Sequence, residues 1–142
     1  MRKIDDIIIH CSATKEGIDY HAADIDKWHK DRGFRCIGYH YVIDLDGTIE
    51  LGRPVNEVGA HCIEQRKNYT SIGVCYIGGL NSKGEPADTR TPAQIIALDK
   101  LLSQLCATYR VPIHGHRDYC RHKECPCFDA HEYYQYIWKK YL

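Results

Sequence analysis

The stretch Ile4-Asp5-Asp6-Ile7-Ile8-Ile9-His10 (IDDIIIH) decides the fold that the rest of the chain is expected to adopt. Its apolar run is too short to favour a helix. It is also continuous rather than alternating, which is typical of a central strand that is covered on both faces. His10 closes the run and is expected at the strand end, where the backbone is held but the side chain is free to face a cleft.

Other segments predict the partners of this strand. Tyr39 to Leu45 and Thr48 to Leu51, joined by the tight-turn pair Asp46-Gly47, predict a β-hairpin. Ile72 to Ile77 predicts a second buried strand, and Ile113 to His116 predicts a short one.

Helices are expected in three places. One follows the loop Cys11 to Asp19 and stops at Gly33, and another is expected after Asp129. Thr91-Pro92-Ala93-Gln94 is the strongest local signal, with an N-cap Thr, Pro at the first helical position and Gln three residues after the cap. The apolar stripe that follows it at helical spacing is Ile95, Leu98, Leu102, Leu105 and Tyr109. Because strands and helices alternate, residues 1–142 are predicted to form a single α/β domain with a central mixed β-sheet flanked by helices.

The composition restricts the classes of partner. The chain has 142 residues, and its 19 Lys and Arg balance its 19 Asp and Glu, so it lacks the positive surplus that a nucleic-acid or acidic-membrane partner usually requires. Asp5 and Asp6 interrupt the basic start, which resembles neither a secretory leader nor a membrane span. We therefore expect synthesis in the cytoplasm without a signal peptide, no membrane insertion, and free or metal-bound thiols for the eight cysteines.

The segment His114 to Asp129 (HGHRDYCRHKECPCFD) is expected to carry the chemistry. It is too polar and irregular for a core element, and it contains three histidines and three cysteines. Neutral imidazole and thiolate are the ligands that zinc prefers, and a catalytic zinc needs three protein ligands with a fourth position open to water. His10, at the end of the apolar run, could supply the third ligand.

A structural zinc knuckle is the alternative for this segment. Five of its side chains could close around an ion: His116, Cys120, His122, Cys125 and Cys127. The usual paired spacing is missing, however, because one residue rather than two to four separates the last two cysteines. His131-Glu132 has no second histidine at the spacing of an HExxH helix. The segment alone leaves a catalytic metal, a structural metal and no metal open.

Seven motifs occur in order along nearly the whole chain: HCSAT (His10–Thr14), GYHY (Gly38–Tyr41), DGT (Asp46–Thr48), NYTSIGVC (Asn68–Cys75), TPAQ (Thr91–Gln94), GHRD (Gly115–Asp118) and KECPCFD (Lys123–Asp129). Together they resemble the zinc-dependent N-acetylmuramoyl-L-alanine amidases, a family that includes phage amidase endolysins, bacterial recycling amidases and animal peptidoglycan recognition proteins. The phage type is the most similar. The resemblance implies an amidase/peptidoglycan-recognition-like fold.

The resemblance implies that His10, His116 and Cys125 hold one Zn²⁺ ion and that Tyr39 and Lys123 are catalytic. Two neutral imidazoles and one thiolate leave the ion able to activate water, and the tyrosine and lysine could stabilise the oxyanion. Two departures from the family pattern bear on the metal ligand and on the general base. Cys127 stands where phage relatives have a small polar residue and could compete for the metal, although Cys125 precedes a proline as the family ligand does. Cys75 stands where some relatives have an acidic general base.

Substrate contacts are expected in the long surface loop Gly52 to Thr70, which borders the cleft by resemblance. Arg53 could hold a stem-peptide carboxylate with two hydrogen bonds. His61 matches a histidine of the phage relatives, and Asn68 lies beside the same cleft.

The function implied is peptidoglycan hydrolysis, with zinc-activated water cleaving the amide between the N-acetylmuramic lactyl group and L-alanine. The main alternative is a module that binds muropeptide without hydrolysing it, and a structural-zinc interaction protein is a weaker one. The substrate lies outside the membrane, so the chain is expected to act on the cell wall after release, with a separate membrane-permeabilising partner giving access.

Overall fold

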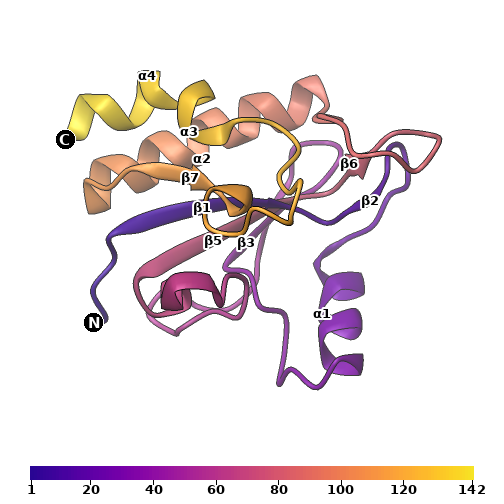
Figure 1. The fold of residues 1–142 in the computed structure, drawn as a ribbon, viewed down its shortest axis with the longest axis horizontal. Helices are drawn as coiled ribbons and strands as arrows, with labels where there is room; N and C mark the ends of the chain where they lie inside the picture. Colours follow the sequence, from indigo (N-terminus) through magenta and orange to yellow (C-terminus); the bar gives the residue numbers. More distant parts are fainter.

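A five-stranded mixed sheet forms the centre of the computed structural model, which describes residues 1–142 (Figure 1). The strand order is β4-β3-β5-β1-β7. Their bounds are β1 Asp6–Cys11, β3 Tyr41–Ile43, β4 Ile49–Leu51, β5 Ser71–Tyr76 and β7 Ile113–Gly115. All neighbours are parallel except the antiparallel hairpin of β3 and β4 at one edge. The prediction of a central mixed sheet is confirmed.

Strand β1 lies inside this sheet, and all six of its residues are buried. Ile7, Ile9 and Cys11 belong to the larger hydrophobic core, on the face that α2 covers. Because successive side chains of a strand alternate between faces, Ile8 and His10 point to the other face. The apolar run therefore places one imidazole at the carboxyl end of a strand that the core holds on both sides.

Helix α2 (Pro92–Tyr109) covers the larger core and begins at the predicted capping box. The Thr91 hydroxyl accepts from the Gln94 backbone N–H at 3.0 Å, and the Gln94 side chain accepts from the Thr91 N–H at 2.9 Å. The Gln94 amide also donates to the carbonyl oxygens of Ile43 and Ile77, at 3.2 and 2.9 Å. One buried side chain thus caps the helix and ties it to the sheet.

Helix α1 (Ala22–Asp31) lies on the opposite side of the sheet from α2 (Figure 1). Its Ile25 belongs to a second, smaller core with Ile37, Val42, Cys75 and Ile77. The cover on this face is narrower than on the face of α2, and His10 faces it beside the helix. This arrangement leaves space for a pocket.

The C-terminal prediction needs correction. The single terminal helix expected after Asp129 is two short helices, α3 (Ala130–Tyr133) and α4 (Gln135–Trp138). Tyr134 separates them because its backbone, with φ −96° and ψ 12°, departs from the helical conformation, while its side chain is fully buried in the core.

Five short elements were not predicted. Strands β2 (Thr14–Lys15) and β6 (Gly79–Leu80) form a separate two-stranded sheet, and each is too short to leave a periodic signal. The other three are 3₁₀ segments: Glu64–Thr70 within the predicted loop Gly52 to Thr70, His116–Asp118, and Lys139–Tyr141 after α4. The strand expected over Ile113 to His116 therefore ends at Gly115.

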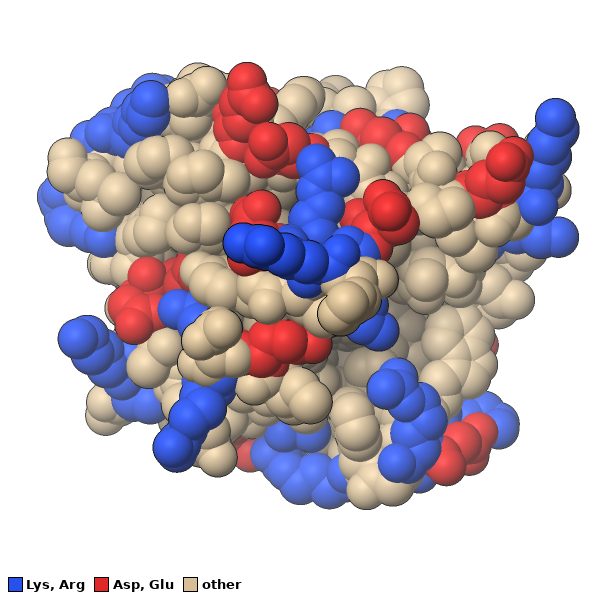
Figure 2. All heavy atoms as spheres, in the orientation of Figure 1, with Lys and Arg blue, Asp and Glu red and all other residues tan.

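Charges of both signs are interspersed over the face shown in Figure 2, in keeping with a formal net charge of +0. No helix in the structure has both the length and the apolar character needed to cross a membrane.

We predict that Gln94→Met lowers the free energy of unfolding by about 1–3 kcal/mol, because it leaves the Ile77 carbonyl oxygen without a donor and the Thr91 N–H without its acceptor while keeping the side-chain volume. Urea unfolding followed by circular dichroism measures the change. Gln104→Met, at an exposed position of the same helix, is the matched control and should change stability by less than about 0.5 kcal/mol. Equal effects of the two substitutions would contradict the structural role given to Gln94.

Candidate metal centre

The register of β1 against β7 brings His10 and His116 together. Ile9 pairs with Gly115 in these parallel strands, so the residues that follow, His10 in β1 and His116 directly after β7, lie at the same edge of the sheet. The two imidazole rings lie with their centroids 4.7 Å apart. Residues distant in the sequence are thus neighbours because of strand pairing alone.

Cys125 completes this group from the loop after β7. Its Sγ lies 3.8 Å from His10 Nδ1, and it accepts a hydrogen bond from the Cys11 backbone N–H at 3.2 Å. Gly115 allows this approach, because a Cβ there would lie 2.7 Å from Cδ of Pro126. One ligand atom each from His10, His116 and Cys125 lies within 4.8 Å of the others.

The donor set fits a zinc ion. Zinc–nitrogen and zinc–sulfur bonds of about 2.0 and 2.3 Å at a tetrahedral angle separate the two atoms by about 3.5 Å, close to the observed 3.8 Å between His10 Nδ1 and Cys125 Sγ. Burial lowers the pKa of His10 well below its ordinary value, which keeps the imidazole neutral as a metal ligand requires. Three ligands leave one tetrahedral position open.

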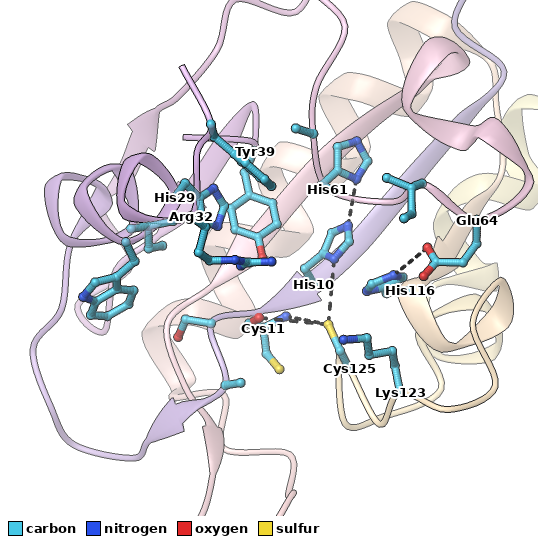
Figure 3. Close-up of a pocket in the computed structure, with 17 residues that line it drawn as sticks. His10, Cys11, His29, Arg32, Tyr39, His61, Glu64, His116, Lys123 and Cys125 are labelled. Atoms are coloured by element: carbon cyan, nitrogen blue, oxygen red, sulfur yellow. Dashed lines mark hydrogen bonds and ion pairs between the residues drawn. The ribbon is translucent and has the colours of Figure 1, made fainter. Parts of the chain in front are cut away.

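Each ligand imidazole also has a partner for its second nitrogen. His10 Nε2 lies 2.8 Å from His61 Nδ1, and His116 Nε2 lies 3.1 Å from a Glu64 carboxylate oxygen (Figure 3). Such contacts fix the tautomer and orientation of a ligand and leave Nδ1 for the ion. His61 sits over Gly73 of β5, where a Cβ would lie 2.7 Å from the ring.

Glu64 is ionised at neutral pH. Burial pushes its pKa upward, but hydrogen bonds from its own backbone N–H and from His116 outweigh that effect and lower the pKa to about 2. A second group of three atoms joins Glu64 and His116 to Cys62. Burial and the adjacent carboxylate raise the pKa of the Cys62 thiol to about 12, so it is a poor source of thiolate. The group with Cys125 is therefore the better metal site.

Cys127 does not join the group. Its thiol donates to the Gly79 carbonyl oxygen at 3.2 Å and lies 3.9 Å from Cys11 Sγ. Cys120 and His122 are absent from the three clusters that could hold an ion. The structure therefore gives no closed four-ligand knuckle from the His114 to Asp129 segment.

The three ligands lie in the wall of a cavity of about 600 Å³ (Figure 3). Helix α1 and the loop after it supply an apolar wall of Ile25, Trp28 and Phe34. Tyr39 and Lys123 also line the cavity. Sequence-predicted residues from four separate segments therefore meet in one place.

Tyr39 and Lys123 differ in environment. The Tyr39 ring lies against His10, with centroids 5.1 Å apart, and burial raises the pKa of its hydroxyl well above the ordinary value. It therefore retains its proton and can donate it in a hydrogen bond. Lys123 is exposed to solvent at the side of Cys125 (Figure 3).

The three residues expected to bind substrate are placed differently. His61 lines the cavity behind His10. Asn68 does not line it. Its side-chain oxygen accepts from the backbone N–H groups of His61 and Cys62, at 2.9 and 2.8 Å, and so shapes the loop. Arg53 is buried away from the cavity and donates to the carbonyl oxygens of Ile37 and Val58. The structure brings only His61 of these three to the pocket.

Two charged residues of the pocket, Glu64 and Arg32, were not predicted from the sequence. Glu64 belongs to 3₁₀ turns within a segment that has no sustained period, so no pattern marked it. Arg32 follows α1 as the C-cap and is the guanidinium that lines the cavity in place of Arg53.

Comparison with known proteins gives consistent matches. Residues 1–128 match the family model described as N-acetylmuramoyl-L-alanine amidase. The endolysin of Enterobacteria phage K11 is 43% identical over 122 residues, which cover 85% of this chain and 79% of the relative. The amidase LysC of Clostridium intestinale is 31% identical with a TM-score of 0.77, covering 98% and 85% of the two chains. Drosophila PGRP-LB, at 24% identity and a TM-score of 0.76 over 95% and 81%, shows the same fold.

We predict that Glu64→Ala weakens zinc binding by about 10–100-fold, because His116 loses the carboxylate that orients it. Competition against a chromophoric chelator measures the affinity. Glu57→Ala, which removes a carboxylate that pairs with Arg35 outside this cavity, is the control and should leave the affinity unchanged. Unaltered zinc affinity in Glu64→Ala would contradict the orienting role.

Proposed function

The chain belongs to the N-acetylmuramoyl-L-alanine amidase family, and we propose that it hydrolyses peptidoglycan with one zinc ion held by His10, His116 and Cys125. It is a peptidoglycan amidase, and the bond that it cleaves joins the lactyl group of N-acetylmuramic acid to L-alanine. The observation that carries the zinc proposal is the approach of the three ligand atoms to within 4.8 Å in the wall of the pocket.

The ligand residues hold the ion in a defined orientation. A bound zinc ion supplies Lewis acidity, which activates water as a nucleophile near neutral pH. His61 and Glu64 fix the rings of His10 and His116, and the backbone N–H of Cys11 supports the Cys125 thiolate. These contacts hold the side chains in place before substrate arrives.

Tyr39 and Lys123 supply positive or proton-donating groups to the reacting amide. Hydrolysis places negative charge on the carbonyl oxygen, and donors that are already positioned stabilise this charge. The Tyr39 hydroxyl donates from the buried side of the pocket, and the Lys123 ammonium approaches from the exposed side. The two residues therefore serve the same oxygen from opposite sides.

Substrate binding depends on the wall that α1 and its following loop provide. Trp28 and Phe34 offer apolar surface to the glycan or to the stem peptide. Arg32 is the cavity-lining guanidinium and takes the carboxylate-binding role that the sequence suggested for Arg53. His61 acts through His10 rather than on substrate.

Binding of muropeptide without hydrolysis is the second candidate, and the similarity to a peptidoglycan recognition protein supports its fold alone. Cys125 argues against it, because a thiolate that completes a three-ligand group is what an open catalytic zinc site needs.

We predict that Cys125→Ala loses bound zinc and lowers clearing of purified cell walls by more than about 100-fold, beyond the range for residues that only orient a ligand. Metal analysis and loss of turbidity give the two readouts. Cys127→Ala, which removes the neighbouring thiol, should keep one zinc and the clearing activity. If Cys127→Ala lost zinc and activity while Cys125→Ala kept both, the ligand role would belong to Cys127. Normal clearing of cell walls by Cys125→Ala would refute hydrolysis that depends on this zinc ligand.

We predict that Tyr39→Phe and Lys123→Ala each lower kcat by about 10²–10³-fold, as expected for removal of one oxyanion donor. Zinc content and KM should change little, because neither residue holds the ion. Steady-state hydrolysis of a soluble muropeptide measures both constants. Lys140→Ala, an exposed lysine near the C-terminus, is the control, and a kcat loss of the same size in it would remove the assignment of Lys123.

A further inference from the structure

A second cluster of metal-binding side chains lies outside the amidase pocket. His21 is the N-cap of α1, Asp44 directly follows β3, and Glu50 belongs to β4. Their candidate ligand atoms all lie within 4.8 Å of one another. None of the three lines the cavity that holds His10, His116 and Cys125.

The contacts converge on the His21 ring. Its Nδ1 lies 3.1 Å from an Asp44 oxygen and 3.4 Å from a Glu50 oxygen. Its Nε2 lies 3.3 Å from a carboxylate oxygen of Asp19, a residue that is largely exposed. One imidazole therefore faces three carboxylates that come from a loop and from both strands of the hairpin.

Asp44 provides the independent observation that points to a ligand. Its side chain is buried, with only 3% of the residue exposed, although carboxylates are almost never buried without full pairing. Its Oδ1 is the only buried side-chain oxygen or nitrogen in the protein that has no hydrogen-bond partner. A bare acceptor on a buried acid costs free energy that a bound cation would recover.

The contact with His21 accounts for only one oxygen of Asp44. His21 Nδ1 lies against Asp44 Oδ2, and Asp44 Oδ1 stays without a partner. A doubly charged ion would offer that oxygen a partner and would balance the neighbouring carboxylates.

We propose that His21, Asp44 and Glu50 form a second cation site, which takes a divalent transition metal of the zinc class. An imidazole nitrogen with carboxylate oxygens suits zinc, whereas magnesium and calcium favour all-oxygen ligands. Solvent reaches the cluster through the half-exposed His21, so water completes the coordination. The pocket offers two imidazoles and a thiolate, whereas this cluster offers one imidazole and two carboxylates, so we expect the second site to bind zinc more weakly than the pocket.

The site has a structural consequence for the pocket. It joins the N-cap residue of α1 to the β3–β4 hairpin, and α1 carries Ile25, Trp28 and His29 into the wall of the amidase cavity. The bound ion stabilises the position of α1 against the hairpin, and thereby the position of this wall, without touching substrate.

Calorimetric titration of the protein already carrying one equivalent of zinc tests the site, with ZnCl₂ as the probe. We expect a second equivalent in the wild type, and a shift of the His21 ring resonances in nuclear magnetic resonance spectra as it binds. Asp44→Asn and Glu50→Gln should each lower the affinity for the second zinc equivalent by more than about tenfold and leave binding of the first equivalent unchanged. Glu50 is the safer substitution because its side chain is partly exposed.

Asp31→Asn is the matched control, since it removes one exposed carboxylate from the far end of the same helix and should retain both equivalents. The absence of a second equivalent in the wild type would overturn the proposal. The proposal would also be overturned if the wild type, Asp44→Asn and Glu50→Gln bound the second zinc equivalent with equal affinity. The zinc would then lie on other surface groups. Neither result bears on the zinc of the amidase pocket, which the first equivalent reports.

Discussion

Parallel pairing of β1 with β7 is the constraint on which the rest of the site depends. With Ile9 opposite Gly115, the residues that follow are His10 in β1 and His116 directly after β7, and both lie at the carboxyl edge of the sheet. A slip of one residue would turn His10 into the hydrophobic core, because successive side chains point to opposite faces. The buried isoleucines prevent such a slip. The apolar packing of β1 thus sets the geometry of a polar site.

The two faces of the sheet are packed to different extents. The face under α2 holds the larger core, and Gln94 locks that helix to the sheet through carbonyl oxygens at Ile43 and Ile77. The face beside α1 has a smaller core and retains a cavity of about 600 Å³. Most of the buried apolar surface therefore lies on the face under α2, and that burial stabilises the fold while the other face keeps its pocket.

Much of this arrangement could be predicted from local sequence signals. The run Ile7 to Ile9 predicts the central strand, Asp46-Gly47 predicts the hairpin, and Thr91 to Gln94 predicts the start of the long helix; all three are confirmed. Each of these signals depends only on residues that are close together in the sequence. The terminal helix prediction was wrong about continuity: the segment is helical, but its backbone leaves the helical conformation at Tyr134, and no local sequence signal marks that break.

The site could be predicted only in part, because a ligand group is a property of register and loop path. Cys125 and Cys127 are separated by one residue, and spacing alone does not say which sulfur faces His10. Backbone contacts decide it, since the Cys11 N–H directs Cys125 toward the imidazoles, while the Gly79 carbonyl accepts from Cys127. The same contacts join the first strand to a loop more than a hundred residues later, so the three candidate ligands meet only in the folded chain. A metal ion bound by these three side chains would therefore also stabilise the fold, because it would bind the folded chain and not the unfolded one.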